Sequence, residues 1–95
     1  FLVLEGQVAL FVFEEDGAIA ECHLLGPETP SWGVDVPAGV WHSMAVLSPH
    51  AVCYELKPGP YVAASDKEFA PWAPREGEPG VPDFLNRLLQ AARRT

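Results

Sequence analysis

Short apolar runs separated by turn residues follow one another closely through the first 57 positions, and no helical stretch lies between them. Runs of this length that are rich in Val, Ile and Phe and stopped by Gly or Pro are typical of β-strands. The predicted strands are 1–5, 7–14, 18–25, 33–36, 40–47 and 51–57. Strands at such close intervals predict an all-β antiparallel sandwich or barrel over residues 1–57.

Two of the connections have the character of hairpin turns. The Glu15-Asp16-Gly17 segment joins 7–14 to 18–25, and an Asp-Gly step suits a tight turn. Ser48-Pro49-His50 is expected to join 40–47 to 51–57 in a second hairpin. The connection 26–32 has a Gly and two Pro residues and is expected to be an irregular loop.

The rest of the chain belongs to the same domain but has a different character. Residues 58–80 are rich in Pro and include Tyr61, Phe69 and Trp72. Large rings need burial, so this segment is expected to cover the barrel, either protecting a sheet edge or closing a cavity as a lid. Residues 81–95 are expected to form a helix, because their apolar residues recur at helical spacing. These residues are Phe84, Leu85, Leu88, Leu89 and Ala92.

Charge narrows the range of partners. The 95 residues have a net charge of −7, and all six Lys and Arg residues lie from Lys57 onward. Binding to nucleic acid requires clustered basic side chains, so no nucleic-acid partner is expected. The same lack of bases disfavours an anionic ligand in the first half of the chain. No apolar run reaches the ~20 residues that cross a bilayer, and no membrane association is expected.

Compartment is indicated by the start of the chain and by its cysteines. The segment FLVLEG has no basic region or cleavage site of a signal peptide, which favours a cytoplasmic location. Cys22 and Cys53 are expected to be two buried thiols, with a disulfide as the alternative.

Among the three histidines, His42 has the most informative context. It follows a Pro37-to-Gly39 bend into a predicted strand, and a rigid entry of this kind can hold a metal ligand in place. Strand alternation puts His42 on one face with Val40, Met44 and Val46. If that face points inward, His42 lies in an apolar environment. The other histidines, His23 and His50, are interpreted as structural or exposed.

Glu55 is the acidic residue of the last predicted strand. It is either a ligand-binding general base, or a group that orients the histidine, or an outward-facing charge. Trp41 and Tyr54 fall on the opposite faces of their strands and are expected to be packing residues.

Two segments resemble a known family. The run PAGVWH (37–42), preceded by GVDV (33–36), resembles the second conserved motif of cupins. GPYVAASDKEFAPWAPREGEP (59–79) resembles the segment after the barrel in WbuC-type cupin-fold metalloproteins, which are associated with bacterial surface polysaccharide clusters. FLVLEGQVALFVFEEDG is similar to the middle of that barrel, so the resemblance covers residues 1–79. It implies a cupin double-stranded β-helix with a divalent metal ion, and His42 as a metal ligand.

The sequence also departs from the cupin pattern. The first cupin motif has two histidines and a glutamate, and only its final glycine has a counterpart here, Gly6. The asparagine that often follows the second-motif histidine is Val46. Either the sequence is a fragment of a longer protein or the usual metal site does not form, because one imidazole does not hold a divalent ion tightly.

Three functions remain open at this stage. The first is a metal-dependent cupin enzyme that acts on a sugar or sugar-derived small molecule. The second is a non-catalytic cupin that binds a small ligand or a metal. The third is a metal-free structural module that dimerises through unpaired strands. The resemblance also implies a homodimer, because many cupins are dimers.

Overall fold

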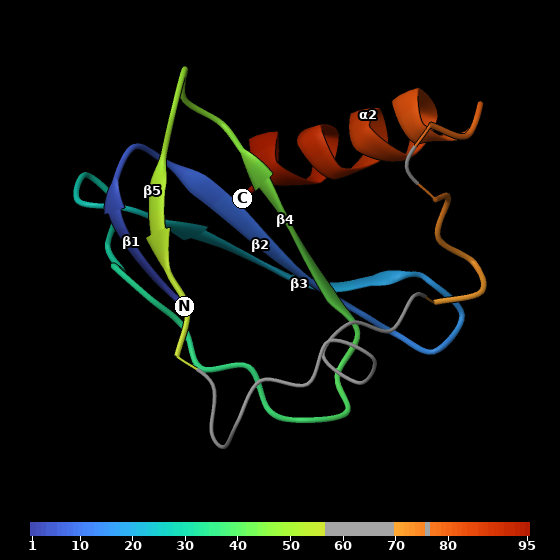
Figure 1. Cartoon of the computed structure of the whole chain (residues 1–95), viewed down its shortest axis with the longest axis horizontal. Helices are drawn as coiled ribbons and strands as arrows, with labels where there is room; N and C mark the ends of the chain where they lie inside the picture. The colour runs from blue at the N-terminus through green and yellow to red at the C-terminus, as the bar shows by residue number, and fades with distance from the viewer. Residues whose placement is uncertain (57–69, 76) are drawn as a thin grey trace.

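The structure, a computed structural model, describes residues 1–56, 70–75 and 77–95. The described strands form two antiparallel sheets, and one helix follows them near the end of the chain (Figure 1). The smaller sheet has the order β1-β5, and the larger has the order β3-β2-β4. The elements are β1 (Leu2–Glu5), β2 (Val8–Phe13), β3 (Ile19–Leu25), β4 (His42–Val46), β5 (Val52–Tyr54) and α2 (Val81–Arg93).

The first predicted hairpin is confirmed. β2 pairs with β3 in antiparallel register, with Val8 opposite Leu25. At the turn, the Glu14 N–H donates to the Ala18 carbonyl at 2.8 Å, and Asp16 Oδ1 accepts from the Ala18 N–H at 3.0 Å. Gly17 has φ +93°, a left-handed conformation that glycine adopts without steric cost. The Asp16-Gly17 step therefore forms the tight turn that the sequence predicts.

The second predicted hairpin is wrong. β4 pairs with β2 and β5 pairs with β1, so the chain crosses from one sheet to the other between them. Ser48 holds this crossover, because its Oγ accepts from the Gln7 N–H at 2.9 Å and donates to the His50 carbonyl at 2.6 Å. Because this turn is hydrogen-bonded to the start of β2, the chain does not fold back along β4 after it. The residues of the turn alone do not indicate that bond.

The segment 33–36 does not form the predicted strand. It contacts β1 through a single bridge between Gly33 and Leu2, and the Val34 N–H donates to the Phe1 carbonyl at 3.0 Å. Pro37 has no N–H to extend the pairing. The segment therefore lies along β1 as an irregular edge and leads into the bend before β4.

The three-stranded sheet buries apolar side chains on both faces. One face packs against α2, and the buried residues of this layer are Ala9, Phe11, Phe13, Ala45, Leu88 and Ala92. The other face packs against β1, and its buried residues are Val3, Val8, Leu10 and Leu25. Burying one such large side chain stabilises a fold by about 1.5–3 kcal/mol. Successive side chains of β2 thus alternate between the two buried layers.

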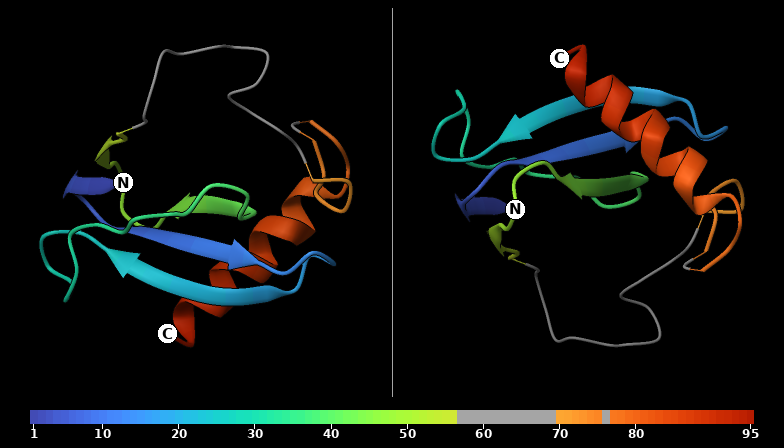
Figure 2. Two further views of the ribbon diagram at one scale, coloured as in Figure 1. Left: turned by 90° about the horizontal axis from the view of Figure 1, so that it is seen from below. Right: turned by 90° about the horizontal axis from the view of Figure 1, so that it is seen from above.

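The predicted C-terminal helix is confirmed. Pro82 occupies the first turn, where its missing N–H leaves no hydrogen bond unmade, and Asp83 lies at the positive end of the helix dipole. α2 runs obliquely across the three-stranded sheet, away from β1 and β5 (Figure 2). Leu88 and Ala92 are buried against the sheet, but Leu85 of the predicted apolar stripe is 44% exposed.

Trp72 packs on the helix side of the sheet. Its ring lies 4.9 Å from the Phe13 ring and 6.3 Å from the Trp41 ring, centroid to centroid. Trp72 therefore covers the end of the β2–β3 hairpin and does not close the cleft at His42. Tyr61 and Phe69 lie outside the described residues, as does most of the predicted covering segment. Within the described ranges, α2 included, no helix has the length and hydropathy to cross a bilayer.

Candidate functional site

The bend before β4 places His42 at the first residue of that strand. Gly39 has φ +81°, and a Cβ built on it would meet no atom within 4 Å. Glycine is therefore needed here for its backbone conformation and not for lack of space. β4 then begins at His42, which lies opposite Val12 of β2 in the register.

The His42 ring is held by its own backbone. Nδ1 lies 3.0 Å from the Val40 carbonyl oxygen. A carbonyl oxygen only accepts, so this hydrogen bond requires the proton of the neutral ring to be on Nδ1. The lone pair is then on Nε2, the atom left for a ligand. The Phe1 ring meets the imidazole edge-on, with the centroids 5.9 Å apart.

His42 lines a cleft of about 400 Å³ together with residues from three parts of the chain. Phe1 comes from the start of the chain, Glu55 and Leu56 follow β5, and the remaining residues belong to the bend. The lining residues are Phe1, Asp35, Val36, Pro37, Ala38, Gly39, Val40, His42, Glu55 and Leu56. The structure thus brings His42 and Glu55 to one cleft, although they do not belong to one hairpin.

Asp35 is a residue of this cleft that the sequence analysis did not single out. It lies two positions before Pro37, and this placement beside the bend was the available signal. With Glu55 it gives the cleft two carboxylates, and no Lys or Arg occurs in residues 1–56. Among the described residues that line the cleft, the charged groups are therefore acidic, and acidic groups disfavour an anionic ligand.

The apolar face expected around His42 is more open than the alternation suggested. Met44 is 37% exposed and Val46 is 55% exposed, although they share a face with His42 as predicted. The small sheet covers Val8, Leu10 and Leu25 on this face and does not extend over β4. His42 is itself exposed, so the site is an open cleft and not an enclosed cavity.

The two aromatic residues expected to pack have different outcomes. Trp41 packs as predicted, in T-shaped contact with Trp72. Tyr54 does not, because it is 54% exposed. Its partner in the register is Leu2, which is also exposed, and both point away from the buried Val3.

The described residues do not make a complete metal site. Within them no three His, Cys, Asp or Glu side chains come together in a group that could hold an ion. His42 supplies one nitrogen, whereas structural and catalytic sites use three or four protein ligands. The metal expectation therefore rests on His42 alone.

The other histidines and the cysteines lie outside this cleft. His23 Nε2 lies 2.9 Å from Glu21 Oε1, and His50 is exposed in the crossover turn. Cys22 is half-buried beneath α2, whereas Cys53 is exposed, which corrects the expectation of two buried thiols. Both thiols are free.

Searches of protein-family models, of curated proteins and of solved structures each found no match to this chain.

Proposed function

We propose that the chain is a cupin-type domain whose His42 cleft binds a small, neutral, hydroxylated molecule, with a sugar or sugar derivative as the preferred class. The strand order supports the cupin-type fold. β5 returns to pair with β1 after the three strands of the other sheet, a long-range closure of the Greek-key kind found in jelly rolls. The two sheets pack face to face through Val3, Val8 and Leu10.

One observation carries the binding proposal: the imidazole of His42 is anchored at Nδ1 and lines the same cleft as Glu55. Nε2 and the carboxylate oxygens accept hydrogen bonds from hydroxyl groups. Phe1, Val36 and Leu56 supply apolar wall for the body of the ligand. A few polar groups in a largely apolar cleft of this size are typical of small-molecule sites.

The test is a titration followed by the backbone amide signals in two-dimensional NMR. Methyl α-glucopyranoside is the neutral probe, and glucose 1-phosphate is the anionic one. Saturable shifts at 39–42 and 55–56 with the neutral probe are expected, and no such shifts with the phosphate. Replacing His42 by Phe keeps a ring but removes the Nε2 acceptor, and is expected to weaken binding about fivefold through the loss of one hydrogen bond.

His50→Phe is the matched control, because His50 is exposed outside the cleft. Equal affinity of the His42→Phe and His50→Phe variants, or shifts confined to other parts of the protein, would contradict the proposal.

The anchored ring also supports a second candidate function, a divalent-metal site with His42 as one of its ligands. Metal-binding histidines commonly donate their other ring N–H to a carbonyl or carboxylate, as Nδ1 does here to Val40. The remaining ligands would have to come from outside the described residues, since these hold no group of three. The enzyme hypothesis adds catalysis to binding, and turnover of a substrate would establish it.

Metal content tests this candidate. The protein is dialysed against Zn²⁺ and then against buffer, and the retained zinc is measured by mass spectrometry. His42→Ala is expected to lose the retained zinc and keep the fold, while His50→Ala retains it. Unchanged stoichiometry in His42→Ala would remove His42 from the ligand set.

We also propose a homodimer in the cytoplasm. Within the described residues, β4 and β5 each pair on one side only, and neither strand contains Asp, Glu, Lys or Arg. Unpaired strand edges are templates for pairing with a second chain. Two copies with a net charge of −7 can meet at such edges without bringing like charges together.

The proposed cytoplasmic location is supported by the thiols. Cys22 and Cys53 are both free, which fits a reducing compartment.

A further inference from the structure

The apolar core between α2 and the three-stranded sheet is open at one end. A cleft lies there, between the end of α2 and the ends of β3 and β4. Its volume is about 470 Å³, within the range of about 300–1,000 Å³ that small-ligand sites occupy. The lining includes Gln7, Leu24, Leu47, Leu89, Ala92 and Arg93. Helix and sheet thus form this cleft together, and it shares no described lining residue with the His42 cleft.

The apolar walls of this cleft belong to the core itself. Leu24, Leu47 and Leu89 are partly buried, and all three pack against the buried cluster that contains Leu88 and Ala92. Leu24 lies opposite Ala9 in the register of β2 and β3, and Ala9 belongs to the layer that α2 covers. An alkyl group placed in the cleft would therefore extend the core at its open end, and the removal of apolar surface from water favours this.

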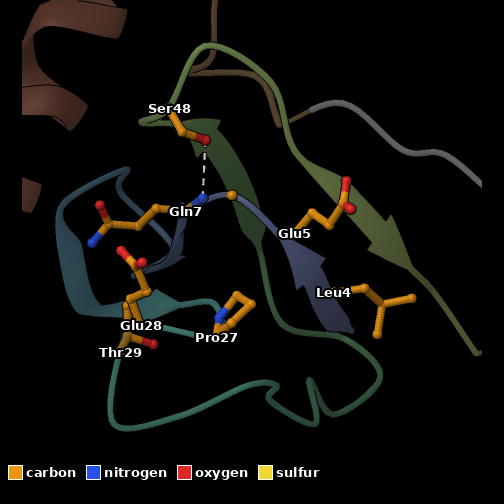
Figure 3. A pocket seen from close by; sticks show the side chains of 8 residues that line it. Leu4, Glu5, Gln7, Pro27, Glu28, Thr29 and Ser48 are labelled. Atoms are coloured by element: carbon orange, nitrogen blue, oxygen red, sulfur yellow. Dashed lines mark hydrogen bonds between the residues drawn. The ribbon is translucent and has the colours of Figure 1, made fainter.

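Two polar side chains of the cleft are not used by the protein. Gln7 is half-buried and its backbone is fixed, because its N–H donates to Ser48 Oγ at 2.9 Å (Figure 3) and its carbonyl accepts from the Leu47 N–H at 2.9 Å. Arg93 lies in the last turn of α2. Within the described part of the chain, the side chains of Gln7 and Arg93 make no hydrogen bond or ion pair. Both are therefore left for a ligand.

Charge distinguishes the two ends of the cleft. Among its described lining residues, Arg93 is the only charged one. Gln7 also lines a neighbouring cleft with Glu28, and its amide lies on the same side of that cleft as the Glu28 carboxylate (Figure 3). A negative group near Gln7 would therefore meet a like charge, whereas near Arg93 it meets a guanidinium that has five donors. Charge complementarity thus places a negative group at the Arg93 end.

From this combination we infer that the cleft binds a short aliphatic carboxylate, with its alkyl chain against the three leucines and its carboxylate at Arg93. A guanidinium donates two parallel hydrogen bonds to the two oxygens of a carboxylate. A neutral alcohol of the same length keeps the apolar contact and loses the ion pair, and an ammonium group is repelled by Arg93. This inference is independent of the function proposed for the His42 cleft.

Three probes with one alkyl chain test the inference. Hexanoate, 1-hexanol and hexylammonium are titrated at neutral pH into the whole protein, and the backbone amide signals are followed by NMR. Hexanoate is expected to produce saturable shifts at 24, 47 and 89–93, and to bind at least about fivefold more tightly than either other probe. Comparable affinity for 1-hexanol would show an apolar groove without charge recognition and would overturn the inference. Hexanoate shifts confined to other parts of the protein would also overturn it.

Two neighbouring arginines test whether the charge acts locally. Arg93→Met keeps an apolar stem but removes the guanidinium, and is expected to weaken hexanoate binding about three- to fivefold, as for an exposed ion pair. Arg94→Met changes the net charge equally at the next position, which does not line the cleft, and is expected to leave the affinity unchanged. Equal weakening by both variants would mean a diffuse effect of net charge and no site, and full affinity in Arg93→Met would remove Arg93 from the site.

Discussion

At the residue scale, two glycines with similar backbone angles are required for different reasons. Gly17 and Gly39 have φ +93° and +81°. A Cβ on Gly17 would come within 2.8 Å of the Trp72 ring, whereas a Cβ on Gly39 would meet nothing within 4 Å. The first glycine is thus required by packing as well as by conformation, and the second by conformation alone.

The pair gives a prediction for stability. Gly39→Ala is expected to lower the free energy of unfolding by about 1–2 kcal/mol, the cost of a left-handed alanine. Gly17→Ala is expected to lose about 1–3 kcal/mol more, because the methyl group displaces Trp72. Urea denaturation of both variants measures the difference. Equal losses would show that Trp72 does not press on the hairpin turn.

Individual residues also show which features of the His42 cleft could be predicted from the sequence and which could not. Pro37, Gly39 and His42 are close in the chain, so the bend and the start of β4 could be predicted from local signals. Asp35 could not be identified from the sequence, because a single exposed carboxylate has no local signature. The exposure of Met44 and Val46 was not predictable either, since alternation identifies a shared face and not what covers it.

At the scale of elements, α2 depends on a few buried contacts with the three-stranded sheet. Leu88 is 3% exposed, whereas Leu85 on the same helix is 44% exposed. Arg87 adds a hydrogen bond at 2.9 Å to the Gly17 carbonyl and lies over the Phe84 ring. The helix is thus fastened to the hairpin turn as well as to the sheet.

One substitution at two positions tests this docking. Leu88→Ala is expected to destabilise the protein by about 2–4 kcal/mol, because it leaves a cavity under the helix. Leu85→Ala is expected to cost less than about 1 kcal/mol, since its side chain is largely solvated. Thermal and chemical denaturation of the two variants check the comparison, and a similar loss at both positions would argue against the packing of α2 on Leu88.

Pairing between elements that are distant in the sequence limits how much of the fold can be predicted. β2, β3 and α2 were predictable, because an Asp-Gly turn and a helical apolar stripe are encoded within a few residues of each other. The pairing of β5 with β1 joins segments about 50 positions apart, and nothing in either segment alone identifies the other.

At the scale of the whole molecule, β4 and β5 each have an edge that no other described strand pairs with, and this makes the oligomeric state the most informative global property. If the proposed homodimer forms there, light scattering is expected to give twice the 10.3 kDa of one chain. Val46→Lys places a charge on the face of β4 and is expected to shift the mass toward the monomer. Leu85→Lys, at another exposed apolar position, is the control and is expected to leave the mass unchanged.

The binding proposal depends most directly on the proton of one imidazole. Long-range ¹H–¹⁵N correlation spectra at pH 9, where histidine rings are ordinarily neutral, distinguish the two tautomers. The spectra are expected to show His42 protonated at Nδ1, with the unprotonated nitrogen at Nε2. His42 protonated at Nε2 would mean that the hydrogen bond to Val40 is not formed and that the ring does not offer its lone pair to the cleft.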